Sequence, residues 1–299
     1  MRLALESCMR QTYRDLEVIV VDDASGDNTR EVVAGFGPNV KYILQDNLER
    51  AAARNNGIKN ARGDMVAFLD SDDVWEPEHL EKCLQALKDH PGADVAYSGS
   101  YIIDSHGAII GKLPFRRSRG DVLKKMVAEY SSGGCNASSC LIKKSVFRTA
   151  GYFNEDRGLS GSEDWEMWVR LAGATGFAST DCYTSKVRFH PGKSSINAQR
   201  MARSMEMALG LVYQNSRLLP RISGLKARAY SSLYCIIAIN FYAAGEMETS
   251  RRYLGKAFRA YPLSAVSNTG LVYTFARTFL GQRLSLFLRR MKQNLRKSI

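Results

Sequence analysis

The chain has 299 residues, of which 45% are hydrophobic and 24% charged, as in an ordinary soluble globular protein of one or two domains. No uninterrupted apolar stretch reaches about 18 residues, which argues against a membrane-spanning helix. The net charge of +12 is uneven, because residues 200–299 hold 17 Lys and Arg against 3 Asp and Glu, whereas residues 1–199 hold 25 against 27. This asymmetry suggests an anionic membrane surface or a nucleic acid as partner of the last third. A nucleic acid is the weaker expectation, since no nucleic-acid module is recognisable.

The beginning of the chain and its cysteines indicate a compartment. The first residues contain no apolar core of a signal peptide, so none is expected. Six cysteines occur, none of them in a C-x-x-C pair, and we expect them to be reduced core residues. The chain is therefore predicted to be cytoplasmic.

Apolar patterns predict helices that alternate with strands over the first hundred residues. The helices are expected at 3–10, 29–36, 50–60 and 78–89, and the strands at 16–21, 40–44, 65–69 and 95–101. Such alternation predicts an α/β fold with a mostly parallel sheet flanked by helices. Further strands are predicted at 137–142 and 187–190, and further helices at 144–149 and 163–172.

The character of the sequence changes at about residue 197, where acids become rare and helical periodicity dominates. We therefore predict one domain over residues 1–197 and a basic helical region over 198–299, with a helix pair at 225–244 and 249–261. A later helix between Leu284 and Leu295 has an apolar face and basic flanks. This pattern is typical of a helix that binds a membrane interface. A helix docked on the domain with a solvated basic face is an equally good interpretation.

Three carboxylates follow the strand predicted at 65–69, namely Asp70, Asp72 and Asp73. Unpaired carboxylates are costly to bury, so these acids require solvent, a basic partner or a hard divalent cation. An acidic turn that caps the next helix is the alternative. Asp22 and Asp23 end another predicted strand, and the carboxyl ends of parallel strands share one rim, where ligands bind. Two acidic strand ends favour the functional interpretation.

Two later positions have side chains suited to chemistry. Asp164 lies in the first turn of the helix predicted at 163–172, at the border of its apolar face. Acids in a first turn suit the helix dipole, but partial desolvation there would also raise the pKa of Asp164 towards general-base use. His190 ends a predicted strand and could ligate a metal or contact a phosphate, although most such histidines are structural.

Four segments in a fixed order resemble the inverting family 2 glycosyltransferases of the GT-A fold. They are QTYRDLEVIVVDDASGDNT, NLERAAARNNGIKNARGDMVAFLDSDDVWEPEHL, SEDWEMWVRLA and RFHPGKSSIN. Each segment alone is weak, but the ordered set is specific and covers roughly residues 1–197. The resemblance implies transfer of a sugar from a nucleotide-diphospho-sugar to a carbohydrate or lipid-linked acceptor, in cell-surface polysaccharide or glycolipid synthesis.

The resemblance also implies a role for each matching residue. Asp22 or Asp23 would bind the base or ribose of the nucleotide, and Arg54 and Asp70 would contribute to the same site. Asp72, assisted by Asp73 and His190, would bind a Mn or Mg ion that bridges the diphosphate. Asp164 would be the general base.

One feature departs from the family pattern. The family normally begins with a strand and a Pro-x-Tyr-Asn-like loop ahead of the first helix, whereas Met1 lies just inside that helix. A catalytically impaired remnant or scaffold of the same fold is therefore the alternative function. A nucleotidyltransferase and a receiver-like signalling domain fit less well, because the chain lacks an early Gly-rich phosphate loop and because a receiver domain would leave residues 110–197 unexplained.

Overall fold

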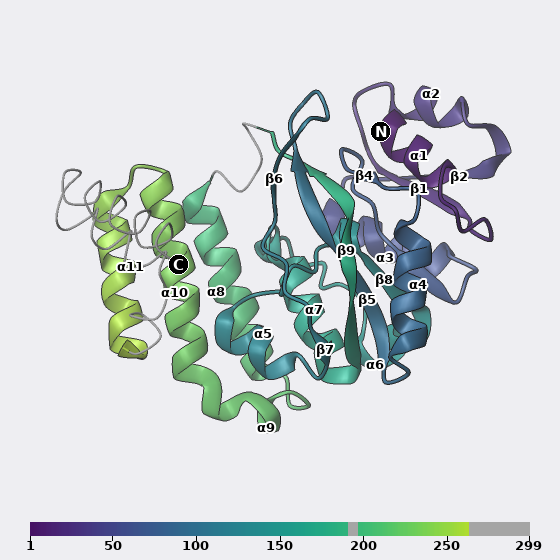
Figure 1. Cartoon of the computed structure of the whole chain (residues 1–299). Coiled ribbons are helices and arrows are strands. Elements are labelled where there is room, and N and C mark those ends of the chain that lie inside the picture. The colour runs from purple at the N-terminus through teal and green to yellow at the C-terminus, as the bar shows by residue number, and fades with distance from the viewer. Residues whose placement is uncertain (191–196, 263–299) are drawn as a thin grey trace, which may run out of the picture.

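The computed structural model describes residues 1–190 and 197–262 (Figure 1). The strands are β1 Val18–Asp23, β2 Val40–Gln45, β3 Met65–Ala67, β4 Val74–Trp75, β5 Ala93–Ile103, β6 Ile109–Lys112, β7 Arg119–Gly120, β8 Cys140–Lys143 and β9 Gly176–Arg188. The α-helices are α1 Arg2–Met9, α2 Thr29–Ala34, α3 Glu49–Asn60, α4 His79–Asp89, α5 Leu123–Glu129, α6 Phe147–Ala150, α7 Glu163–Ala174, α8 Ala198–Gln214, α9 Leu219–Ile222, α10 Lys226–Ala243 and α11 Met247–Ala260. The predicted α/β class, with a central sheet flanked by helices and a helical C-terminal region, is confirmed.

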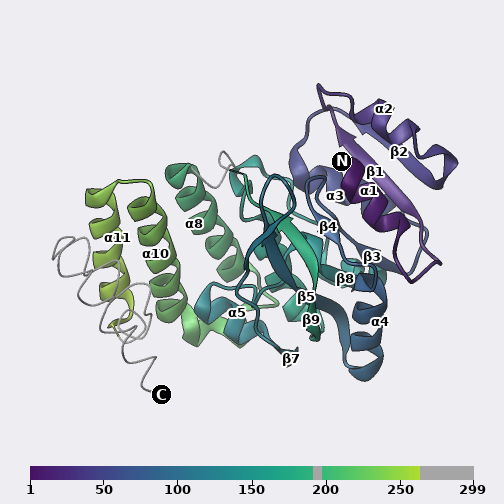
Figure 2. The same ribbon diagram turned by 45° about the horizontal axis from the view of Figure 1, so that its top comes forward.

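The first two strands form a small parallel sheet of their own. The pairing runs from Val18 opposite Val40 to Asp23 opposite Gln45. Leu5 of α1 and Val33 of α2 pack against Val20 of β1 and Val40 of β2. Both views place the unit at one end of the molecule (Figures 1 and 2). Among the described residues, β1 pairs with no strand other than β2.

The larger sheet has the strand order β3-β8-β5-β9-β4, with β6 beside β5 and β7 beside β9. Within it β5 and β9 are parallel, whereas the other pairs are antiparallel. The prediction of a mostly parallel sheet is therefore corrected to a mixed sheet. The physical reason is that β8 inserts between β3 and β5 in the opposite direction, after an irregular excursion of the chain that includes β6 and β7.

The two faces of this sheet bury different side chains. Alternate residues of β5, Val95 and Tyr97, join a large apolar core that includes α5, α7 and α8. The intervening Ala96 packs on the opposite face with Leu141 of β8 and with residues of α4 such as Cys83. This alternation is what a strand that is buried on both faces requires.

The helical region continues the larger core. Ala202 and Leu209 of α8, Leu233 of α10 and Leu254 of α11 are buried in the same cluster as Trp168 of α7. The predicted helix pair is confirmed, and Gly245 makes the turn between its members with a positive φ of 83°, a conformation that glycine adopts without strain. Figure 2 shows α8, α10 and α11 side by side at the far end from β1. The division at residue 197 stays a prediction.

Several predicted elements differ in extent from the observed ones. The strand predicted at 137–142 begins as a 3₁₀ turn over Ala137–Ser139 and becomes β8 only at Cys140. The strand predicted at 187–190 is the end of the 13-residue β9. In the described part of the chain, no helix is long and apolar enough to cross a membrane. The predicted interfacial helix at 284–295 lies outside the described residues.

Candidate active site

The three acids after β3 lie together in space. Asp70, Asp72 and Asp73 each offer an oxygen within 4.8 Å of the others. Asp73 is buried, whereas the side chains of Asp70 and Asp72 are 40% and 31% exposed. A set of carboxylate oxygens suits Mg or Mn, so these residues fit the divalent ion that the sequence predicts.

Asp73 anchors this acid loop, which we define as residues 70–73, to the rest of the fold. One of its carboxylate oxygens accepts a hydrogen bond from the Ser138 hydroxyl at 2.7 Å, and the other accepts from the backbone N–H of Arg188 at 2.8 Å. Burial raises the pKa of Asp73 to about 6, although both hydrogen bonds act in the opposite direction. The Ser138 hydroxyl also accepts a hydrogen bond from the Asp70 N–H at 3.1 Å.

The end of β9 and the residues just after it contact the acid loop. The Nε of Arg188 donates to the carbonyl of Asp72 at 2.9 Å, and its Nη1 donates to the carbonyls of Asp104 and Ser105. His190 Nε2 lies 3.2 Å from the Asp72 carboxylate, and its side chain is 42% exposed. The structure thus brings the predicted His190 to the predicted metal residue. Sequence reasoning missed Arg188, because its partners are mainly backbone carbonyls that no sequence pattern marks.

Asp22 and Asp23 form a second acidic position at the end of β1. Asp22 accepts from the Tyr42 hydroxyl at 2.6 Å and from the Ser25 N–H at 2.8 Å. Burial alone would raise the pKa of Asp22, but these hydrogen bonds outweigh it and lower the pKa. Asp23 accepts from Gln45 at 2.7 Å and from the Leu48 N–H at 2.9 Å. Side chains of β2 therefore orient both acids, together with the loop after β1 for Asp22 and the loop after β2 for Asp23.

The first turn of α7 carries the Glu163–Asp164 pair. Glu163 is buried and accepts a hydrogen bond from the Gly161 N–H at 2.6 Å. Asp164 is half-buried and accepts from the Trp165 N–H at 2.7 Å. Desolvation, followed by the negative charge of Glu163, raises the pKa of Asp164 to about 6, while the cation of Arg54 acts to lower it. A carboxylate with such a pKa can accept a proton near neutral pH.

Arg54 of α3 connects the acid loop with the first turn of α7. Its Nη2 lies 3.1 Å from Asp70 and its Nη1 lies 3.2 Å from Glu163. The structure therefore brings Arg54, Asp70 and the start of α7 into one contiguous site, although Arg54 and Glu163 are 109 residues apart in the chain.

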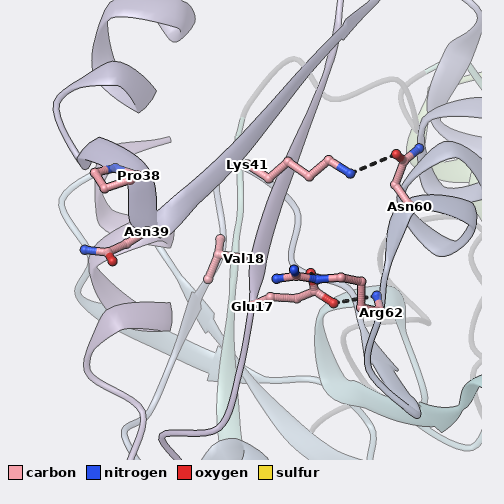
Figure 3. Close-up of a pocket in the computed structure, with 7 residues that line it drawn as sticks. All are labelled: Glu17, Val18, Pro38, Asn39, Lys41, Asn60 and Arg62. Carbon is pink, nitrogen blue, oxygen red and sulfur yellow. Dashed lines mark hydrogen bonds and ion pairs between the residues drawn. The ribbon is translucent and has the colours of Figure 1, made fainter.

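A groove of about 310 Å³ lies elsewhere, at the starts of β1 and β2 (Figure 3). Within it Lys41 Nζ donates to Asn60 at 2.9 Å, and the Glu17 carboxylate accepts from the Arg62 N–H at 2.6 Å. Asp22 and Asp23 lie at the opposite end of β1. The groove therefore does not belong to the acid site.

A family model and individual relatives that match this chain are all described as glycosyltransferases. A family model described as "Glycosyl transferase family 2" matches residues 1–151. An uncharacterized glycosyltransferase of Rickettsia felis is 28% identical over 65% of this chain and 33% of its own length. A second uncharacterized glycosyltransferase, MJ1057 of Methanocaldococcus jannaschii, is 27% identical over 56% of this chain and 58% of its own. The chain thus spans about a third to just over half the length of such relatives.

Solved structures show the same fold. The crystal structure of Staphylococcus aureus TarS 1–349 in complex with UDP-GlcNAc matches with a TM-score of 0.61 at 18% identity, over 97% of this chain and 87% of that one. A further TarS crystal structure matches with a TM-score of 0.58 over 92% of this chain and 50% of that one. At this identity the likeness concerns the fold.

Proposed function

This chain belongs to glycosyl transferase family 2, and from that premise we propose that it transfers a sugar from a nucleotide-diphospho-sugar to an acceptor hydroxyl with inversion at the anomeric carbon. The observation that carries the proposal is the contiguous arrangement of the acid loop, Arg54 and the Glu163–Asp164 pair. It would supply a cation site and, on the other side of Arg54, a proton acceptor. UDP is the first nucleotide to test, because the matching TarS structure contains UDP-GlcNAc.

The acid loop and the end of β1 would bind the donor. Asp72 and His190, whose side chains meet at 3.2 Å and are both partly exposed, would hold a Mn or Mg ion. Such an ion, when bound, neutralises the charge that develops on the leaving diphosphate. Asp70 would contact the ribose or help to position the metal. Asp22 or Asp23 would accept hydrogen bonds from the base or ribose.

Asp73 has a more structural part in this proposal. Each of its oxygens already accepts a hydrogen bond from the protein, and its carboxylate is buried. It would assist the metal site by fixing the backbone of the acid loop, so that Asp72 keeps one orientation. Preorganised ligands avoid the free-energy cost of ordering them when the ion binds.

Asp164 would act as general base on the acceptor. The acceptor oxygen forms a bond to the anomeric carbon as the bond from that carbon to the diphosphate oxygen breaks. The hydroxyl proton passes to Asp164, and the nucleoside diphosphate leaves. Attack from the face opposite the leaving group inverts the anomeric centre. The raised pKa of Asp164 brings it close to the pH at which general-base catalysis is efficient.

The acceptor and cellular setting are part of the same proposal. A carbohydrate or lipid-linked acceptor in cell-surface polysaccharide or glycolipid synthesis fits the family. We propose action in the cytoplasm, with peripheral attachment to an anionic membrane through the basic C-terminal third.

Calorimetric titration of UDP and GDP into the full chain, with and without Mn²⁺, tests the donor site. We expect metal-dependent binding of one nucleotide, weakened at least about tenfold in Asp72→Asn, because loss of a metal ligand or its neighbours typically costs 10–100-fold in affinity. Asp89→Asn, an exposed acid at the end of α4, is the matched control and should bind as the parent does.

Two outcomes would contradict the proposal. Absence of metal-dependent binding of either nucleotide would remove the donor site. Binding without release of nucleotide from any UDP- or GDP-sugar, in the presence of a panel of glycan and lipid-linked acceptors, would favour the alternative of a non-catalytic remnant or scaffold of the same fold.

A further inference from the structure

Arg54 lies between the acid loop and the base-bearing helix, and it is nearly inaccessible to solvent. Its side chain is 10% exposed, while that of Glu163 is 5% exposed. The two terminal nitrogens bind different carboxylates, one from each region. The guanidinium also lies over the ring of Phe153, 5.6 Å from the centroid. Arg54 thus has protein partners on several sides.

The helix that carries Arg54 is itself fixed to the segment leading into α7. The side-chain amide of the next residue, Asn55, donates to the Phe153 carbonyl at 2.9 Å and accepts from the Phe153 N–H at 2.9 Å. Asn55 is buried. Because both hydrogen bonds are buried, α3 and residue 153 cannot shift apart without leaving polar groups unpaired. Arg54 therefore projects from a rigid support.

Glu163 depends on this cation. A buried carboxylate without a partner would take up a proton or destabilise the fold. Arg50 also approaches Glu163 at 3.6 Å, but its side chain is 48% exposed, so solvent screens that pair. The closer and more buried partner is Arg54. Glu163 in turn accepts from the Gly161 N–H, and this contact sets the chain direction just before Asp164.

We propose that Arg54 is a positioning residue that fixes Asp70 and the Asp164-bearing first turn of α7 in one geometry, rather than a ligand of the nucleotide. The inference rests on the proposed function and revises the role that the family resemblance implied for Arg54. The planar guanidinium can bind two carboxylates in fixed directions, which the single ammonium of lysine cannot reproduce. Donor and base would then be aligned by one buried group.

The position of Arg54 also affects the charge state of the base. The charged and titratable groups that act on Asp164 are Glu163 of its own helix, Arg54 and Arg50 of α3, and Tyr130 and Cys135 of the segment packed against it. Among these, the arginines lower the pKa of Asp164. Removal of Arg54 should therefore raise that pKa and move the acidic limb of the pH–kcat profile to higher pH.

The test compares Arg54→Ala and Arg54→Lys with a matched variant in the full chain. Arg170 of α7 is similarly buried at 13% exposed. It binds Glu166 at 2.7 Å and donates to the carbonyls of Ala150 and Tyr152, all of which lie outside the acid loop. Arg170→Ala therefore controls for the loss of a buried arginine from the same neighbourhood. Three quantities are measured with Mn²⁺ present: the dissociation constant of UDP, kcat for release of UDP from a UDP-sugar, and its pH profile.

We expect Arg54→Ala to lower kcat about 100-fold, since misplacement of reacting groups by about 1 Å costs that much, while the UDP dissociation constant stays within about twofold. The acidic limb should move to higher pH. Arg54→Lys should restore the limb, because the charge returns, but recover kcat only partly. Arg170→Ala should change thermal stability without moving the limb. If Arg54→Ala does not fold, Arg54→Lys alone tests the proposal. Its acidic limb should then lie where the parent's does, while its kcat is lower than that of the parent.

Two results would overturn the inference. One is a UDP dissociation constant that rises tenfold or more in Arg54→Ala with an unchanged limb, which would make Arg54 a donor ligand. The other is an unchanged kcat in both Arg54 variants. Failure of the proposed function is distinguishable from either, because the parent chain itself would then fail to bind a nucleotide or fail to release one from a nucleotide-sugar.

Discussion

Asp164 should reduce the stability of the folded chain at neutral pH, and its replacement by asparagine should reverse this. The carboxylate is half-buried beside Glu163, and its pKa is raised from 3.8 to about 6. Below pH 3.8 the folded and unfolded chains both carry the proton. Between these two values the unfolded chain has lost the proton while the folded chain keeps it. The free energy of unfolding therefore falls as pH rises through this window.

The size of the effect follows from the shift. About two pKa units correspond to roughly 3 kcal/mol, since one unit is about 1.4 kcal/mol, and partial exposure makes this an upper bound. Asp164→Asn keeps the side-chain oxygen that accepts from the Trp165 N–H and removes the charge. We expect the variant to be about 1–3 kcal/mol more stable than the parent at pH 8, equally stable at pH 4, and inactive in sugar transfer.

Urea unfolding of both proteins at several pH values between 4 and 8 measures this difference. Asp89→Asn, which changes an exposed acid, should differ from the parent by less than about 0.5 kcal/mol throughout. A stability gain in Asp164→Asn that is the same at pH 4 and pH 8 would refute the electrostatic reasoning, and so would a loss of stability at pH 8.

Three further predictions concern packing and buried hydrogen bonds. Trp168 is fully buried and meets Phe153 edge to face at 6.1 Å, so Trp168→Ala should cost about 3–5 kcal/mol in urea unfolding; a cost below about 1 kcal/mol would contradict the packing. Gly99→Ala would place a Cβ 2.7 Å from the Tyr183 ring; we expect it to lower the free energy of unfolding by about 1–3 kcal/mol, and we expect this cost to disappear when the change is made in a Tyr183→Ala background. Asn55→Ala leaves two backbone groups of Phe153 unpaired, so a loss of about 2 kcal/mol or more is expected, and thermal unfolding that matches the parent would show that water replaces the amide.

The sequence predicted the elements that have strong local signals. The run before Asp70 predicted β3, and the acids after it do converge. The helix at 163–172 was found because its tryptophans repeat at helical spacing, and α7 covers it. His190 lies next to Asp72, whereas the role of the two residues as metal ligands stays a prediction.

Other features had no local signal. Most of β9 was missed because its residues Ser179–Ser185 are mainly polar or small, and they belong to a strand through their pairing with β5 and β4. The direction of β8 depends on which strands flank it, and no property of Cys140–Lys143 alone encodes that. The role of Arg188 depends on carbonyl groups, and carbonyls look the same at every position in a sequence.

The hydrogen bond from the Arg188 N–H to Asp73 bears on when the site can form during protein synthesis. The two residues are 115 positions apart, and Arg54 and Glu163 are separated by 109. Contacts of such length form late, because a long loop must close before they contribute. During synthesis the acid loop therefore emerges from the ribosome long before the strand that fixes it. The nascent chain can acquire its local helices early, but a site able to bind a donor is expected only after residue 188 has been translated and β9 has paired.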